Sequence, residues 1–394
     1  MLESCKAGAE KQQNVEKRLN VLTISVFPNI ITIKELGTGS GTGSGTKNNK
    51  NDNYMGKVMK NLTISQIAEL AGVSKTTVSR VLNNKDDIKG ETRERILQVI
   101  RENNYRPNSA ARTINNRSTR TIGLLIPYQA DYVLSNPFYY DVIRGITVEA
   151  DLNDYYTLLM YSQKDSYLKT VREKRIDGLL LISFGTQHIK LLQELLETDI
   201  PMISLAKVPG FSTVPTVSVD DFDGAKKAVS HLIEQGHRDI AVINGPQTLV
   251  GHAERIKGYR AVLESHGIPY REELVLEREI SVENGHLAMK KLLGEQTFTA
   301  AFICCDLMAI GAIEAIRDSG LRVPEDISIV GYDNIPMSGH LSPALTTVDQ
   351  FAYKKGRRAT QALIAQMEGT SMRRSLEIKP ELVIRGSTAR RPRE

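Results

Sequence analysis

The stretch LTISQIAELAGVSKTTVSRVLN, residues 62–83, predicts two short helices joined by a glycine turn. Thr63 and Gln66 have the spacing of a capping box, so the first helix is expected to begin there, and Gly72 is expected to end it. Ser74 is a suitable N-cap for the second helix. The apolar residues expected on one face of the first helix are Ile64, Ile67 and Leu70.

The second helix is expected to have one apolar and one polar face. Val78, Val81 and Leu82 are predicted to face inward, which leaves hydroxyl groups and positive charge outside. Such side chains suit a recognition helix in the major groove, where arginine can pair with guanine and hydroxyls can bind phosphates. The alternative is a hairpin of two helices whose second helix is only solvated. The DNA contacts predicted in this region are Thr63, Ser74, Lys75, Thr76, Thr77, Ser79, Arg80 and Asn83.

The charge distribution agrees with a DNA-binding head. The 394 residues carry a net charge of +5, with 41% hydrophobic and 25% charged residues, which is ordinary for a chain of two or three domains. Residues 59–120 contain twelve Lys and Arg against six Asp and Glu, whereas residues 121–394 contain 31 against 35. The basic excess therefore lies beside the two predicted helices, and the remainder is mildly acidic.

Residues 59–107 are predicted to form one small domain. A third amphipathic helix, with Ile96, Val99 and Ile100 inward, should close its core, and Pro107 should end it. Residues 1–58 contain a Gly, Ser and Thr tract and no periodic pattern, so we expect disorder or an over-extended reading frame with Met59 or Met55 as the natural start.

Several motifs resemble the lactose/galactose-repressor family of bacterial transcription regulators. The most specific are VSKTTVSRVLN (73–83), GHRDIAVING (236–245), GLRVPEDISIVGYDN (320–334) and PALTTVDQ (343–350), and the resemblance covers about residues 60–390. It implies a helix-turn-helix head, a hinge helix at residues 108–119, and a periplasmic-binding-protein-like core at residues 120–388 that binds an effector and dimerises. A basic tail, residues 389–394, follows.

The resemblance also implies how the hinge works. In the family this linker folds when two subunits meet over the operator, and an apolar side chain wedges into the minor groove. The matching residues are Asn108, Ala111, Arg112 and Ile114, with Ile114 where leucine is usual. A β-branched wedge is blunter, which affects the expected kink. The alternative is a plain flexible linker.

From residue 121 the sequence alternates buried strands with helices, which predicts parallel sheets. The first series of apolar runs is TIGLLIP, TLLMYS, GLLLIS and PMISLA; the second is TVSVDD, DIAVING, ELVLERE, AAFICC and ISIVGYD. We therefore expect two doubly wound halves. The resemblance implies that a final helix and strand cross back between them.

A ligand of such a fold binds at the carboxyl ends of the strands, in the cleft between the halves. Asp306 follows AAFICC and Arg255 opens the helix after DIAVING, and a carboxylate facing a guanidinium suits a polyol. Both match ligand-contacting positions of the resembled family; alternatively Asp306 is an N-cap and Arg255 a surface ion pair. Phe138 and Tyr139 are predicted to stack on a sugar, although such residues also build cores.

The remaining cleft residues refine the expected ligand. Asp220 and Asp221 match an Asp-Asn pair of the family, so Asp221 removes a hydrogen-bond donor. The purine-binding branch has arginine where this chain has Leu249 and a stacking phenylalanine where it has Ile280. The resemblance thus favours a sugar or sugar phosphate over a nucleobase.

Three cysteines, Cys5, Cys304 and Cys305, are too few for a disulfide framework, and the adjacent pair is expected to be buried. A redox or metal switch at this pair is the alternative. We predict a cytoplasmic homodimer that binds a palindromic operator and represses carbohydrate genes, with no cofactor. Alternatives are control by a phosphorylated carrier protein, or an exported sugar receptor, although no export signal is evident. The nucleotide-binding, hydrolase and zinc-protease motifs that would indicate an enzyme are missing.

Overall fold

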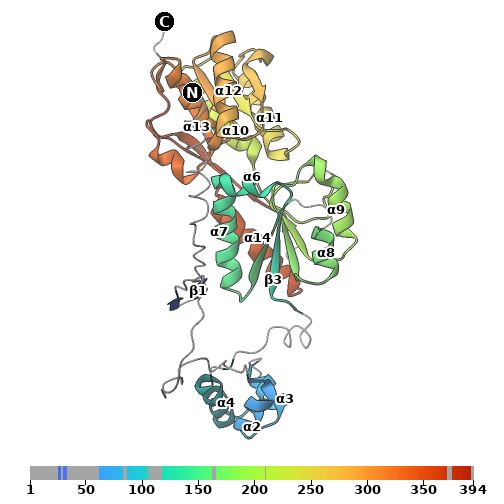
Figure 1. Cartoon of the computed structure of the whole chain (residues 1–394). Helices are drawn as coiled ribbons and strands as arrows, with labels where there is room; N and C mark the ends of the chain where they lie inside the picture. The colour runs from blue at the N-terminus through green and yellow to red at the C-terminus, as the bar shows by residue number, and fades with distance from the viewer. Residues whose placement is uncertain are drawn as a thin grey trace, which may run out of the picture. The chain divides into compact units, whose positions relative to one another are not determined.

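The structure is a computed structural model of the chain. It describes residues 25–27, 30–32, 62–82, 87–103, 105, 118–161, 166–208, 210–370 and 375–391 (Figure 1). Two units, Met1–Asn61 and Leu62–Glu394, are considered separately. Among the residues that the structure describes, no helix combines the length and apolar composition that a membrane crossing requires.

The first unit contains one described element, an antiparallel pair of short strands. They are β1 (Ser25–Phe27) and β2 (Ile30–Thr32), with Val26 opposite Ile31. These β-branched and aromatic residues favour an extended, paired backbone. The expectation of disorder or an over-extended reading frame for residues 1–58 stays a prediction. The proposed start at Met59 or Met55 lies outside the described residues.

Three helices form the head: α2 (Ile64–Leu70), α3 (Lys75–Leu82) and α4 (Gly90–Glu102). Its core is centred on Ile67, Val78 and Ile96, which are fully buried. The capping box at Thr63 is present, and Ser74 Oγ accepts a hydrogen bond of 3.1 Å from the Thr77 amide, so both predicted helix starts are confirmed. Leu70, at the end of the predicted apolar face, is 56% exposed.

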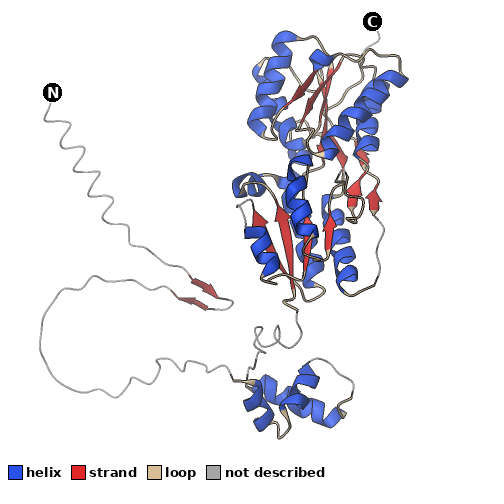
Figure 2. Cartoon of the chain, turned by 90° about the vertical axis from the view of Figure 1, so that its right-hand side faces the viewer, coloured by secondary structure: helices blue, strands red, loops and turns tan. Residues whose placement is uncertain are grey.

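The first half of the core contains a four-stranded parallel sheet in the order β4-β3-β5-β6. Leu124, in the middle of β3, lies between Leu159 and Leu180. Figure 2 shows helices on both sides of the strands, as the alternating pattern predicted. The elements of this half are β3 (Thr121–Ile126), α6 (Ala130–Ser135), α7 (Pro137–Asp151), β4 (Tyr156–Tyr161), α8 (Ser166–Arg172), β5 (Gly178–Leu181), η2 (Thr186–His188), α9 (Ile189–Leu196) and β6 (Met202–Ser204).

The second half contains a six-stranded sheet in the order β14-β12-β11-β10-β8-β9. All neighbours in it are parallel except β12 and β14. Helices α10 and α11 pack on one face, and α12 and α13 on the other. The elements are α10 (Asp221–Glu234), β8 (Ile240–Asn244), α11 (Val250–Ser265), η3 (Glu272–Leu274), β9 (Val275–Glu277), α12 (Val282–Glu295), β10 (Ala300–Ile303), α13 (Asp306–Asp318), β11 (Ser328–Asp333), η4 (Pro336–His340), β12 (Thr346–Asp349) and β14 (Glu381–Val383).

A third, two-stranded sheet joins the halves. Its strands, β7 (Val217–Val219) and β13 (Leu376–Ile378), are parallel, and a bridge from Ser204 to Thr216 links them to β6. The strand TVSVDD was therefore wrongly placed in the second series, because its neighbours are β6 and a strand far along the chain. The chain passes between the halves after β6, after β12 and after β13, so they share the several connections that were expected.

The last long helix, α14 (Ala352–Met367), returns to the first half and packs against α7. The two helices cross at glycines: a Cβ on Gly145 would meet the Tyr353 carbonyl, and one on Gly356 would meet the Val142 carbonyl. An ion pair of 2.7 Å from Arg357 to Glu149 adds to this contact. The crossing brings the start of α14 beside the start of α7 and thereby builds one wall of the cleft.

Candidate functional site

A cleft lies at the carboxyl ends of strands from both halves. Its wall includes residues that follow β5, β6, β10, β11 and β12, together with the first turns of α7, α10, α11 and α14. Open parallel sheets bind ligands at such a place, because loops and helix starts converge there. Four of the five residues predicted for the effector lie in this wall, namely Phe138, Tyr139, Asp220 and Arg255.

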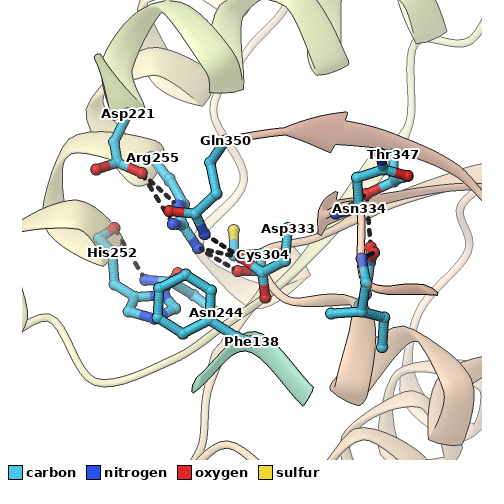
Figure 3. Close-up of polar contacts among 12 residues, drawn as sticks. Phe138, Asp221, Asn244, His252, Arg255, Cys304, Asp333, Asn334, Thr347 and Gln350 are labelled. Carbon is cyan, nitrogen blue, oxygen red and sulfur yellow. Dashed lines mark hydrogen bonds and ion pairs between the residues drawn. The ribbon is translucent and has the colours of Figure 1, made fainter. Parts of the chain in front are cut away.

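Arg255 is the centre of the polar contacts (Figure 3). Its side chain is only 7% exposed, and Nε and Nη2 lie 2.9 and 2.8 Å from Asp221 Oδ1. Nη1 donates to the Cys304 carbonyl at 2.6 Å, and the guanidinium lies 3.6 Å from the centre of the Tyr332 ring. A guanidinium has five N–H donors, so two of them remain for a ligand. Burial opposes the charge, but the Asp221 carboxylate raises the pKa of Arg255, which stays cationic.

Asp333 ends β11 and faces the same guanidinium. Its Oδ1 lies 4.0 Å from Arg255 Nη1 and accepts a hydrogen bond of 2.5 Å from Gln350 Nε2. Burial raises the pKa of Asp333 to about 6, although the neighbouring Arg255 opposes that change. Asp333 therefore adds a second, more distant carboxylate to the cleft beside Arg255.

Asp306 does not contact the cleft, which corrects its predicted role. The side chain is fully buried; Oδ1 accepts a 2.6 Å bond from Thr347 Oγ1 and Oδ2 a 3.0 Å bond from the Ile335 amide. Figure 3 shows the Thr347 and Asn334 region apart from the Arg255 cluster. Gly331 allows this arrangement, because a Cβ there would collide with Asp306. Asp306 connects α13 to β12, so a structural role replaces the predicted ligand contact. The alternative reading as an N-cap is also wrong, because Cys305 holds that position.

The two aspartates before α10 have different partners. Asp220 is the N-cap and accepts a 3.0 Å bond from the Asp223 amide, and Lys379 Nζ lies 2.5 Å from its other oxygen. Burial acts to raise the pKa of Asp220, but the hydrogen bond from Lys379 lowers it below its usual value. Asp221 was interpreted only as a lost hydrogen-bond donor. Its place beside Arg255 makes it the principal anion of the cluster instead.

Aromatic rings form the wall contributed by the first half. Tyr139 is 3% exposed and Phe138 is half-buried, and their rings are 5.4 Å apart in an edge-on arrangement. Tyr132 extends this group, at 6.0 Å from Tyr139. Tyr139 also belongs to the apolar core, and its stacking on a sugar stays a prediction. Leu249 and Ile280 line the cleft as well.

His252 forms part of the wall next to α11. Its Nδ1 lies 3.1 Å from Asn244 Oδ1, and the Asn244 amide donates to the His252 carbonyl at 3.2 Å. Complete burial lowers the pKa of His252 well below its usual value, so the ring is neutral. Gly245 allows the ring to lie close to the end of β8, where a Cβ would collide with it.

The two vicinal cysteines are buried and free, which confirms their expected burial. Burial raises the pKa of both thiols, so neither is a reactive thiolate. In the described ranges, no group of three His, Cys, Asp or Glu side chains lies close enough together to hold a metal ion. Cys5 lies outside those ranges.

The head exposes the predicted polar face of α3. Lys75, Thr76 and Arg80 are exposed, whereas Thr77 and Ser79 are half-buried. Arg80 Nη1 forms a 3.0 Å ion pair with Asp87, and both side chains are 53% exposed. Thr63 and Ser74 serve as helix caps. The predicted contacts outside the described residues are Asn83, Asn108, Ala111, Arg112 and Ile114.

Comparison with known families identifies both parts of the chain. Residues 63–108 match the model of bacterial regulatory proteins of the lacI family, and residues 229–388 match the periplasmic binding protein-like domain. The repressor PurR of Pasteurella multocida is 34% identical over 338 residues, which cover 84% of this chain and 99% of that protein. The chain belongs to the lacI family. It is thus a DNA-binding transcriptional regulator, and the alternative of an exported receptor is not favoured.

Further relatives and solved structures agree. Catabolite control protein A of Priestia megaterium is 33% identical and covers 82% of this chain and 98% of its own length. The Lac repressor dimer bound to operator and an anti-inducer is 28% identical, with a TM-score of 0.73 over 84% of this chain and 100% of that one. A complex of the regulator CelR with cellobiose is 32% identical in sequence. The match has a TM-score of 0.65 and covers 83% of this chain and 99% of that one. The relatives are regulators, which fits a role other than catalysis.

Several polar residues of the cleft were not predicted from the sequence, among them Asp333, Gln350 and Lys355. Asp333 ends an apolar strand just as Asp306 follows one. The rule that ligands bind at the carboxyl ends of parallel strands therefore pointed to both residues equally. Gln350 lies at the end of β12, a strand that was not predicted separately. Lys355 occurs within a helical stretch rich in Lys and Arg, where nothing local distinguishes a buried lysine from an exposed one.

Proposed function

We propose that this regulator binds a palindromic operator as a homodimer and represses carbohydrate genes under the control of a polyol ligand in the cleft. The observation that carries the proposal is the buried Arg255, held between Asp221 and Asp333 with two donors left over. Charged groups that are already oriented can bind adjacent hydroxyls without further ordering. The nearby Phe138 and Tyr139 offer apolar faces for a sugar ring.

A nucleobase is less suitable as the ligand. In the purine-binding branch of the family, the cleft residue at Leu249 is an arginine and that at Ile280 is a stacking phenylalanine. Here both positions are aliphatic and both line the cleft, so neither supplies a cation or an aromatic face. The cellobiose complex of the related regulator CelR supports a sugar as the class of ligand.

The head supports operator binding through α3. Lys75, Thr76 and Arg80 project from one exposed face, and the apolar face is fixed in the core. The ion pair between Arg80 and Asp87 must open for Arg80 to reach a base, but an exposed pair contributes only about 0.2–1 kcal/mol. A bidentate contact to guanine contributes about 1–3 kcal/mol of base discrimination, which exceeds that loss.

The two sites are coupled through the core in this proposal. A ligand that contacts both halves sets their relative angle, and the angle decides whether the segments at residues 108–119 of two subunits can meet over the operator. Coupling of about 1–3 kcal/mol changes operator occupancy about five- to hundredfold. The Lac repressor dimer on its operator supports the dimeric assembly. Because the partner is genomic DNA, we place the protein in the bacterial cytoplasm.

The test is fluorescence anisotropy of labelled DNA from upstream of the protein's own gene, measured with and without a panel of sugars. The label belongs on the DNA because the chain has no Trp. We expect one class of sugar to change the dissociation constant at least fivefold in the full chain and to leave Arg255→Met unaffected. Tight operator binding that no sugar changes would contradict the ligand class and leave the regulator in place.

A further inference from the structure

The cleft contains a lysine for which the described residues supply no polar partner. Lys355, in the first turn of α14, is 8% exposed and lines the cleft. Its Nζ lies 5.7 Å from the centre of the Phe138 ring. In the part of the chain that the structure describes, no hydrogen bond or ion pair reaches this ammonium. The other lysine of the cleft, Lys207, is exposed and bonds to Glu377 at 2.5 Å.

This arrangement is costly in the absence of a ligand. An ammonium has three donors, and a charge buried without acceptors is strongly disfavoured relative to water. The nearby carboxylates already have partners, because Asp221 bonds to Arg255 and Asp333 accepts from Gln350. Burial lowers the pKa of Lys355 to about 8, so at neutral pH the group is still mostly cationic.

The neighbouring elements hold the ammonium in place. Gly145 and Gly356 let α7 and α14 approach closely, which positions Lys355 over Phe138. The charges around the ammonium have both signs: the carboxylates of Asp221 and Asp333 favour its protonation, and the guanidinium of Arg255 opposes it. The three N–H donors of the ammonium are what an anionic group of a ligand would find on this side of the cleft.

We propose that Lys355 binds an anionic substituent of the polyol ligand, either a phosphate ester or a carboxylate, while Arg255 binds its hydroxyls. This inference rests on the proposed function, and it narrows the ligand from sugars in general to charged sugar derivatives. Lys355 then determines specificity, because a neutral sugar leaves its ammonium without acceptors and an anionic sugar satisfies it.

The experiment uses the full chain, the variant Lys355→Met and the control Lys354→Met. Lys354 is the next residue on α14, is exposed, and lies 5.4 Å from the Phe351 ring, so it matches Lys355 in all but burial. Isothermal titration calorimetry measures the dissociation constants of glucose, galactose and mannose, of their 6-phosphates and of their uronic acids. Inorganic phosphate is titrated separately. Methionine preserves the unbranched apolar stem, and operator binding shows that each variant is folded.

We expect at least one anionic sugar to bind at least tenfold more tightly than its neutral parent, and Lys355→Met to remove that preference while Lys354→Met keeps it. The phosphate and uronate members show which anion the site takes. A neutral sugar that binds as tightly as its derivatives, or an anion preference that survives in Lys355→Met, would overturn the inference but leave the proposed function intact. If none of the sugars binds, the result contradicts both the role of Lys355 and the proposed sugar ligand.

Discussion

The head and the cleft each contain an arginine paired with an aspartate, and the two pairs lie in opposite surroundings. Arg80 and Asp87 are both 53% exposed, whereas Arg255 and Asp221 are 7% and 16% exposed. The exposed pair exchanges with water at little cost, so Arg80 is available to a charged partner such as DNA. The buried pair is expensive to break, because the remaining carboxylate would lose the guanidinium that balances its charge. Exposure, more than the identity of the pair, decides what each arginine can do.

The largest effect is expected from breaking the buried pair. Arg255→Ala should lower the free energy of unfolding of the core by about 3–5 kcal/mol, because it leaves Asp221 buried without its guanidinium. Urea denaturation followed by far-UV circular dichroism measures this change. The double variant Arg255→Met with Asp221→Leu should recover much of the loss, since it removes both charges. A loss below about 1 kcal/mol in the single variant would show that the buried pair contributes no more to stability than the exposed one, and would contradict this comparison.

Removing the ammonium of Lys355 should stabilise the protein, whereas breaking the pair of Arg255 and Asp221 destabilises it. Lys355→Met should raise the free energy of unfolding at pH 7 by about 1–3 kcal/mol, because it removes a charge that burial disfavours. The folded pKa of about 8 lies below the unfolded value of 10.5, so the penalty is complete below pH 8. It declines as the pH rises from 8 to 10.5, and above 10.5 it is absent because the lysine is then neutral in both the folded and the unfolded chain.

Thermal denaturation from pH 7 to pH 10 measures this difference. The wild-type protein should gain stability relative to Lys355→Met across that window, and Lys354→Met should follow the wild type throughout. A gain at pH 7 that stays constant up to pH 10 would show that packing, and not the charge, is responsible.

Variants of Asp306 and Asp333, which lie at the ends of neighbouring strands, should differ in whether they affect stability or ligand binding. Asp306→Ala should cost about 1–3 kcal/mol of stability, because Thr347 and the Ile335 amide lose a buried acceptor. It should leave the affinity for the sugar ligand within twofold of the wild type. Asp333→Ala should weaken ligand binding at least tenfold. Calorimetric titration of both variants tests this, and a loss of affinity in Asp306→Ala would restore its predicted place at the ligand.

The smallest change in stability is expected at the exposed pair. Arg80→Ala should change the unfolding free energy of the head by about 0.2–1 kcal/mol. It should nevertheless weaken the free energy of operator binding by about 1–3 kcal/mol and relax the preference for one base of the operator. Asp87→Ala removes the same ion pair but no base contact, so it serves as the control. Equal losses on operator and on random DNA in Arg80→Ala would exclude a base contact.

Local signals account for what the sequence determined alone. The starts of α2 and α3 follow from Thr63, Gln66 and Ser74, whose bonds span only three residues. The strands of both sheets follow from short apolar runs, and the cleft from the rule that ligands bind where parallel strands end. Arg255 was identified in this way, because it occurs in the first helix after β8.

Tertiary structure decided which side chains the cleft contains. Asp306 and Asp333 are both acidic residues at strand ends, and only the contacts of Asp306 with Thr347 and Ile335, far along the chain, place it away from the cleft. Lys355 differs from the exposed Lys354 only through the crossing of α14 with α7. Partners separated by tens or hundreds of residues leave no local pattern, so burial and pairing emerge only when the helices and sheets pack.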